Sequence, residues 1–257
     1  MNRYEIWIAF MTIVIREVRR FLRIWPQTII PPVVTMALFF LIFGNVIGSR
    51  IGSMQGLPYS QFVAPGLIML SVITNSYGNV VSSFYGSKFQ RNIEELMVSP
   101  TPNFIILTGY IVGGMARGLL VGLIVSLVSL FFTDLSIFSP MIALAIILLT
   151  SMMFSVAGFL NAIYADSFDD ISVIPNFVLT PLIYLGGVFY STSLLNEFWA
   201  NVSLINPILY MVNTFRFGFS GVTDIDISWA FTMVCLFTLV LFLTSLKLLR
   251  DSPRLRS

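Results

Sequence analysis

Long apolar runs alternate with short polar connections along this chain of 257 residues. A helix needs about 20 mostly apolar residues to cross the hydrocarbon core of a bilayer, which is about 30 Å thick. The pattern therefore predicts an all-α polytopic membrane protein with a single transmembrane domain over residues 1–257. Six membrane-spanning helices are predicted, at residues 26–47, 62–84, 104–132, 141–164, 173–190 and 229–249.

The composition agrees with this pattern. Hydrophobic residues make up 57% of the chain, charged residues make up 10%, and the mean hydropathy is +0.91. A soluble domain carries about a quarter charged residues, so we expect the bilayer to act as the solvent. The net charge of +2 gives no reason to expect a nucleic-acid partner. The sequence has one cysteine, Cys235, and no histidine, which excludes an internal disulfide and any histidine-based catalytic or metal site.

The basic residues gather on one side of the predicted membrane. If both termini are cytoplasmic, eleven of the fourteen lysines and arginines lie in cytoplasmic segments, two lie in outer connections, and Arg117 lies within a span. Cytoplasmic segments of membrane proteins carry such an excess, so an even number of spans with both termini inside is predicted. The outer pair is Arg50 and Arg216. The eleven are Arg3, Arg16, Arg19, Arg20, Arg23, Lys88, Arg91, Lys247, Arg250, Arg254 and Arg256.

Residues 1–25 mix five of these arginines with aromatic and aliphatic side chains such as Trp7. We expect an amphipathic helix that lies in the interfacial plane of the membrane, and an ordinary cytoplasmic tail is the alternative. A cleavable signal peptide would instead have one basic patch, an apolar run and a small-residue cleavage site. The first span opens at Pro26, and we expect Pro31 and Pro32 to break it near its start.

The third predicted span combines closely spaced glycines with a charge. Small residues four apart let helices approach closely, either within one subunit or at a dimer seam. Arg117 has a structural interpretation, in which it bonds to backbone carbonyls, Asn79 or Asn161. It also has a functional one, in which it contacts an anionic cargo headgroup or braces a gate. The glycines are Gly109, Gly113, Gly114, Gly118 and Gly122.

The fifth predicted span holds Pro175 and Pro181, so it should be kinked, and its freed carbonyls must be satisfied inside the protein or a cavity. Three polar side chains follow it at helical spacing and line either a translocation pathway or a buried helix contact. They are Asn176, Thr180 and Tyr184.

Three acidic residues, Asp166, Asp169 and Asp170, precede this span. Helix capping is favoured for them over a divalent metal site, so no metal is predicted.

A short amphipathic helix is predicted in the cytoplasmic connection between the second and third spans. Ile93, Leu96 and Met97 fall at helical spacing among charged residues, and Ser99-Pro100 should end the helix. This helix either orients the third span or inserts its exposed apolar residues into a groove of a cytoplasmic partner.

The stretch from Arg91 to Pro100, Arg-Asn-Ile-Glu-Glu-Leu-Met-Val-Ser-Pro, resembles the signature of ABC-2 type transporter permeases. Two further stretches resemble motifs of that family: Leu185–Ser191, at the end of the fifth span, and Ile205–Arg216, before the last span. The resemblance covers essentially the whole chain. It implies a subunit of a bacterial ABC exporter in the inner membrane, of the drug, lipid or polysaccharide subset.

The resemblance also implies specific partners and roles. A second copy of the chain and two copies of an ATP-binding cassette subunit would complete the transporter, with ATP and Mg²⁺ held by those subunits. The fifth span would contribute to the dimer interface and the pathway, and re-entrant helices would precede the last span on the outer side. The coupling helix that docks on the ATP-binding subunit would comprise Arg91, Asn92, Ile93, Glu94, Glu95, Leu96 and Met97.

Other classes of function fit the residues less well. The only lysines, Lys88 and Lys247, do not follow the glycine pattern of a phosphate-binding loop, so we expect no ATP hydrolysis in this chain. A standalone secondary transporter or channel is the alternative, but it would call for ion-coupling acidic residues within the spans. An intramembrane hydrolase would need a Ser–Lys pair, and both lysines lie near the cytoplasmic surface. We therefore expect a permease that moves an amphipathic or hydrophobic cargo.

Overall fold

The computed structural model describes residues 1–251, which are almost entirely helical, so Arg254 and Arg256 lie outside the described residues. In chain order the elements are α1 (Arg3–Arg23), α2 (Trp25–Phe39), the π-helix η1 (Phe40–Ile47), α3 (Gly48–Ile51), β1 (Ser53–Met54), β2 (Leu57–Pro58), α4 (Tyr59–Phe89), α5 (Asn92–Val98), α6 (Asn103–Ser129), α7 (Pro140–Tyr164), α8 (Asp170–Ile174), the π-helix η2 (Pro175–Leu179), α9 (Thr180–Tyr184), the 3-10 helix η3 (Thr192–Leu194), α10 (Glu197–Ser203), α11 (Pro207–Ser220) and α12 (Ile227–Asp251).

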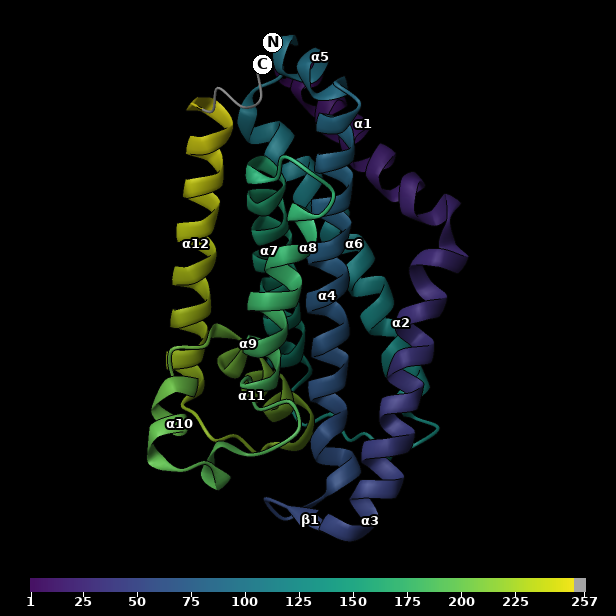
Figure 1. Ribbon diagram of the computed structural model, residues 1–257, viewed down its shortest axis with the longest axis vertical. Helices are drawn as coiled ribbons and strands as arrows, with labels where there is room; N and C mark the ends of the chain where they lie inside the picture. Colours follow the sequence, from purple (N-terminus) through teal and green to yellow (C-terminus); the bar gives the residue numbers. More distant parts are fainter. Residues whose placement is uncertain (252–257) are drawn as a thin grey trace.

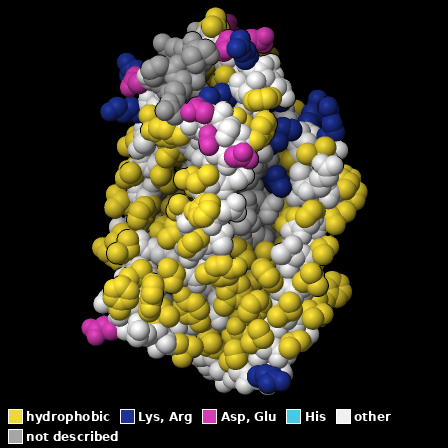
Figure 2. Space-filling view, in the orientation of Figure 1, with side chains coloured by type: hydrophobic (Ala, Val, Ile, Leu, Met, Phe, Trp, Pro, Cys, Tyr) yellow, Lys and Arg dark blue, Asp and Glu magenta, His cyan; other side chains and the backbone are white. Residues whose placement is uncertain are grey.

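The long helices form an elongated bundle with two distinct ends (Figure 1). One end carries α5, the start of α1 and the last turn of α12, and the other carries α3, α10 and the small hairpin of β1 and β2. Lysines and arginines gather around the first end, whereas hydrophobic side chains cover most of the rest of the visible face (Figure 2). This distribution is typical of a bundle whose middle lies in lipid.

Four helical segments of the described chain are long and apolar enough to cross a membrane: Trp25–Ile51, Asn103–Ser129, Pro140–Tyr164 and Ile227–Asp251. They correspond to the predicted spans 26–47, 104–132, 141–164 and 229–249. The chain is therefore a multi-pass α-helical membrane protein. The hydropathy and length of its helices support four crossings, two fewer than the sequence pattern predicts.

The predicted span 62–84 lies within α4, a helix of 31 residues at the centre of the bundle. At about 46 Å it is long enough to cross the bilayer, but it is too polar to be identified by hydropathy. Its polar side chains, Ser71, Asn75, Ser76 and Asn79, are buried inside the protein. Because α6, α7 and α11 pack around α4, these groups do not face lipid.

The predicted span 173–190 departs further from the prediction than 62–84 does, because its helical part is too short to cross the bilayer. The helical segment Asp170–Tyr184 has about 15 residues and is about 22 Å long, shorter than the hydrocarbon core. It ends before Gly187, whose φ of +68° turns the chain in a conformation that glycine adopts at low cost. The π-helix η2 begins at Pro175, as expected where a proline interrupts the backbone hydrogen bonds of a helix.

The expected break at Pro31 and Pro32 is wrong, because α2 continues through both prolines to Phe39. The irregularity comes later, as the π-helix η1. Residues 191–228, in the region where the family resemblance implies helices before the last span, contain η3 and the helices α10 and α11. Most of α11 is buried against α4, α7 and α12.

The glycines of α6 pack against other helices of the same chain, which confirms the intra-subunit interpretation. A Cβ atom added at Gly109 would lie 2.6 Å from Ile13 of α1, and one at Gly122 would lie 2.5 Å from Val72 of α4. The three glycines between them also leave no room for a side chain: Gly113 meets Glu17, Gly114 meets Val80 and Ser155, and Gly118 meets Ser76.

The closest backbone approach between α4 and α7 gives a test of this packing. At Gly158 of α7, an added Cβ would lie 2.5 Å from the carbonyl oxygen of Tyr77, and backbone cannot move aside cheaply. We expect Gly158→Ala to destabilise the bundle by about 1–3 kcal/mol. Thermal unfolding in detergent measures the loss. Gly78→Ala is the matched control, because its Cβ meets no atom within 4 Å, and it should leave stability unchanged or raised. Equal effects of the two would contradict the close packing.

Candidate functional site

The amphipathic helix predicted near residue 93 is α5, which caps the end of the bundle beyond α4 (Figure 1). Arg91 precedes it in the left-handed conformation, with φ of 61°, and this turn redirects the chain away from α4. The helix ends at Val98 because Ser99, before Pro100, adopts an extended conformation. The predicted position and end of the helix are therefore confirmed.

Three of the four apolar residues of α5 face its own bundle, contrary to the alternative in which they would enter a partner's groove. Ile93 is only 2% exposed, and Leu96 and Met97 pack against the core of the bundle. These three side chains hold α5 on its own subunit. The face left open for a partner carries Arg91, Asn92, Glu95 and Val98, with Glu94 half-buried beside it.

The end of α4 beneath α5 is tied to the end of α7. The ammonium group of Lys88 donates to the carbonyl oxygens of Ile163 at 3.1 Å and Ala165 at 2.7 Å, and it lies 3.5 Å from the carboxylate of Asp166. A lysine is well suited to the carbonyls that a helix C-terminus leaves unpaired. A push on α5 would therefore act on α4 and α7 together.

Of the three acidic residues, Asp170 bonds to the turn that leads into α8, whereas Asp169, the N-cap residue of that helix, makes no side-chain capping hydrogen bond. The Asp170 carboxylate accepts from the backbone N–H groups of Asp166 and Ser167, both at 2.9 Å. These bonds, led by that from Asp166, hold the pKa of Asp170 below its usual range. Within residues 1–251, no group of three or more His, Cys, Asp or Glu is placed to hold a metal ion.

Arg117 bonds to a backbone carbonyl, which is the structural interpretation. Its Nη2 lies 3.4 Å from the carbonyl oxygen of Thr28 on α2. Thr28 is four residues before Pro32, which has no N–H to donate to it, so the proline leaves this oxygen without its helical partner. The two asparagines considered as partners bond elsewhere: Asn79 accepts from Arg20, and Asn161 donates to Tyr77.

The same arrangement recurs in the fifth predicted span. Pro175 cannot donate to the carbonyl of Ile171, and the side-chain amide of Asn161 on α7 donates to that oxygen at 3.2 Å. This satisfies the prediction that freed carbonyls of the span must find partners inside the protein.

A double-mutant cycle tests the pairing of Arg117 with the proline-freed carbonyl. We expect Arg117→Met to cost about 1–3 kcal/mol, because the Thr28 oxygen loses its donor. In a Pro32→Ala background the cost should fall by about 1 kcal/mol, because that substitution restores a backbone N–H for the same oxygen. Thermal unfolding in detergent gives the four stabilities.

Pro31→Ala is the control background, because it restores an N–H aimed at a different carbonyl. The cost of Arg117→Met should be unchanged in it. A cycle in which Pro31→Ala and Pro32→Ala behave alike would contradict the pairing.

Arg216 was assigned to an outer connection by the sequence, but it is fully buried within α11. Its Nη2 donates to the carbonyl of Gly187 at 2.7 Å and its Nε to the carbonyl of Phe62 at 3.1 Å. Its guanidinium also lies 3.8 Å from the centre of the Phe62 ring, a cation–π distance. The motif Ile205–Arg216 is therefore bonded to the turn of the motif Leu185–Ser191. The arginine at the end of the motif Ile205–Arg216 is the sequence signal that could have indicated a buried, hydrogen-bonded side chain.

A polar network continues from Arg216 to the end of the bundle opposite α5. Asn213 accepts from Arg216 at 3.4 Å and from the backbone of Asp224 at 3.3 Å. The Asp224 carboxylate accepts from the Ser191 hydroxyl, and it also accepts from the side-chain amide of Gln55 at the tip of the β1–β2 hairpin. Three segments far apart in the sequence are thus joined at the end of the bundle opposite α5.

Removing the shared acceptor tests this outer network. We expect Asp224→Ala to speed backbone hydrogen exchange about tenfold in residues 53–58 and 191–194, because both segments lose a partner. Mass spectrometry of the exchanged protein localises the effect. Asp226→Ala is the matched control, since that exposed carboxylate accepts from Trp229 in the first turn of α12. Unchanged exchange in Asp224→Ala would contradict a role of Asp224 in closing this end.

The three polar residues of the fifth predicted span share an exposed face. Asn176, Thr180 and Tyr184 all face outward, so they do not form a buried contact within this subunit. Thr180 and Tyr184 line a groove of about 270 Å³ with α2 and α4. The Thr180 hydroxyl donates within its own helix, to the carbonyl of Pro175. The structure thus groups Thr180 and Tyr184, but not Asn176, with α2.

These features define a class: a polytopic helical membrane protein with an end-capping amphipathic helix and a polar clamp at the opposite end. The chain belongs to the ABC-2 type transporter family, whose family model matches residues 8–220. It is similar to the inner membrane transport permease YadH of Escherichia coli K12, with 52% identity over 251 residues, 98% of each chain. It is more distantly similar to nodulation protein J of Sinorhizobium fredii NGR234, with 24% identity over 83% of this chain and 81% of the relative. A second nodulation protein J, from Rhizobium leguminosarum bv. viciae, is 22% identical over 80% of each chain.

Family membership establishes a transport permease of the inner membrane and implies an ATP-binding partner subunit. It leaves the cargo and the detailed assembly open to proposal.

Proposed function

We propose that this chain is the membrane-spanning subunit of an ATP-driven exporter, assembled from two copies of it and two copies of an ATP-binding cassette subunit. The observation that carries the proposal is α5, a short helix anchored on its own bundle by Ile93, Leu96 and Met97. Its opposite face, which carries Glu95 among polar residues and the exposed Val98, stays open. In an ABC-2 permease, such a face is suited to receive force from a partner. ATP and Mg²⁺ belong to that partner.

Both termini face the cytoplasm in this proposal, with α1 in the interfacial plane. The gathering of basic side chains at the end with α5 supports the orientation (Figure 2). Six crossings result if α4 and the predicted span 173–190 are counted with the four apolar segments. The buried helix α11 is then a re-entrant element of the outer leaflet.

Energy enters at α5 and passes into α4 and α7 through Lys88. Closure of the two ATP-binding subunits pushes on α5, and the bundle tilts as a rigid body between inward-facing and outward-facing arrangements. The cargo is amphipathic or hydrophobic. Its route follows the exposed face of α8–α9, which also contributes to contact with the second copy, and Asn176, Thr180 and Tyr184 supply polar groups there.

A charge reversal on the open face of α5 tests the coupling. We expect Glu95→Arg to release the ATP-binding subunit that co-purifies with the wild-type permease in mild detergent, with at least about tenfold less retained, because a desolvated interface tolerates a reversed charge poorly. The amount of each subunit in the purified complex is the measurement. Fold integrity is checked by thermal unfolding of the permease.

Glu197→Arg is the matched control, because Glu197 is also an exposed glutamate but lies on α10 at the opposite end. It should retain the partner fully. A wild-type permease that purifies alone, or retention that Glu95→Arg leaves unchanged, would favour the alternative of a standalone secondary transporter or channel.

A further inference from the structure

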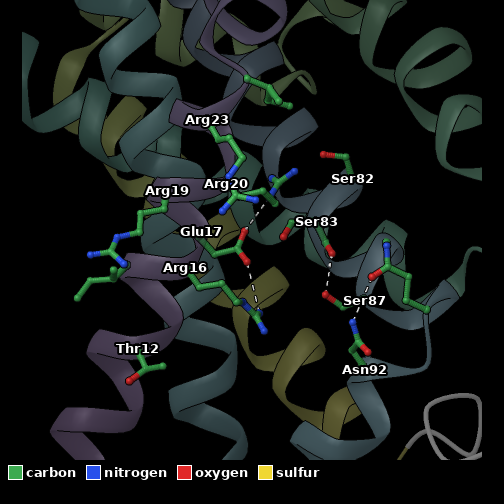
Figure 3. A pocket seen from close by; sticks show the side chains of 14 residues that line it. Thr12, Arg16, Glu17, Arg19, Arg20, Arg23, Ser82, Ser83, Ser87 and Asn92 are labelled. Carbon is green, nitrogen blue, oxygen red and sulfur yellow. Dashed lines mark hydrogen bonds and ion pairs between the residues drawn. The ribbon is translucent and has the colours of Figure 1, made fainter.

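A basic groove of about 900 Å³ lies between α1 and the last turns of α4, beside the start of α5. Figure 3 shows Arg16 and Arg20 on the side of α1 that faces Ser83 and Ser87 of α4, with Arg19 on the outer side of α1. Four arginines line this groove, together with a single carboxylate, that of Glu17. The groove is therefore strongly cationic. The proposed contact between α5 and an ATP-binding subunit gives no reason for this charge.

The inner wall of the groove is held rigidly. Arg16 donates to the hydroxyl of Tyr110 at 2.6 Å, and Arg20 donates to both the backbone and side-chain oxygens of Asn79, at 2.9 and 2.8 Å. Glu17 is 1% exposed and lies 3.4 Å from Arg16 and 3.5 Å from Arg20. These contacts fix two guanidinium groups in place before any ligand arrives, which lowers the entropy cost of binding.

Other donors of the groove remain available. Arg19 and Arg23 are exposed and make no hydrogen bond or ion pair within residues 1–251. Ser83 lines the groove at 5% exposure, and its hydroxyl is a neutral donor there. Guanidinium forks next to hydroxyl groups match the several oxygens of a phosphate group.

The surroundings favour an amphiphile as the carrier of that phosphate. Large apolar side chains of α1, among them Ile15 in the groove and Leu22 nearby, are exposed at 46% and 44%. In an interfacial helix such residues face acyl chains while the arginines lie at headgroup level. An acidic segment of a partner protein would match the charge but would leave this apolar surface uncovered.

We propose that the groove between α1 and α4 binds the phosphate-bearing headgroup of an anionic amphiphile. The site can be measured on the permease alone, so it goes beyond the proposed coupling and does not depend on it. Arg19 and Arg23 supply unpaired charge, Arg16 and Arg20 supply a fixed wall, and Ser83 supplies a neutral donor.

Native mass spectrometry of the permease in detergent, titrated with phosphatidylglycerol, tests the site. We expect Arg19→Gln/Arg23→Gln to weaken binding by about tenfold or more, because each arginine near a headgroup contributes to anionic-lipid affinity. Arg19→Lys/Arg23→Lys, which keeps the charges, should retain most of the binding. Phosphatidylethanolamine, which has no net charge, should bind weakly to all variants.

Arg3→Gln/Arg50→Gln is the matched control, because it removes the same two charges from exposed positions outside the groove. Its binding should stay within about twofold of the wild type. Equal weakening in both double variants would mean that overall charge attracts the lipid, and it would overturn the site. So would unchanged binding in Arg19→Gln/Arg23→Gln, or loss of the ATP-binding subunit from that variant without any loss of lipid, which would assign the groove to a protein partner.

Competition by inorganic pyrophosphate separates the two sources of the phosphate. Displacement of the lipid by pyrophosphate supports a site that recognises the phosphate itself, free or on a carrier. Lipid binding that needs the arginines but resists pyrophosphate supports a site for a bilayer lipid, to which the acyl chains also contribute.

Discussion

The structure depends on one constraint: backbone groups buried in lipid must find hydrogen-bond partners within the protein. Prolines in two segments remove N–H groups and leave carbonyls without helical partners. Side chains of neighbouring helices bond to these oxygens, Arg117 to Thr28 and Asn161 to Ile171. Arg216 bonds in a similar way to the carbonyl of the turn at Gly187. The Thr28 and Ile171 carbonyls, which Pro32 and Pro175 deprive of helical partners, thus each form a specific contact with a neighbouring helix.

The same constraint explains the central place of α4. A helix that carries buried serines and asparagines can lie in a membrane protein only where other helices surround it. The glycines of α6 and Gly158 of α7 allow that close approach. The result is a compact core around α4, linked by Lys88 to α7 at one end and by Arg216 to the outer turn at the other. Such a core suits the rigid-body movement that we propose for the transport cycle.

The sequence predicted the helical class, four of the spans, the position of α5 and the packing role of the glycines in α6. These features could be predicted because the length of an apolar run, the spacing of small residues and a Ser-Pro pair at the end of a helix are all local signals. Three results depend on tertiary contacts that no local signal reports. Ile93 faces its own core, α2 continues through Pro31 and Pro32, and Arg216 is buried. Hydropathy identifies only four crossings for a related reason, because the neighbours of α4 shield its polar side chains and the segment Asp170–Tyr184 is short.

A single cysteine on the open face of α5 would test most directly whether energy reaches the bundle through this helix. Cys235 is the only cysteine of the sequence, so Cys235→Ser/Val98→Cys carries one reactive thiol at a position that is 87% exposed. A thiol-to-amine crosslinker should join this variant to the ATP-binding subunit, with a yield that changes when vanadate traps the nucleotide-bound state. Cys235→Ser/Ile51→Cys, at the opposite end, should give no such product. Efficient crosslinking from the Ile51 position, or none from the Val98 position in an intact complex, would contradict coupling through α5.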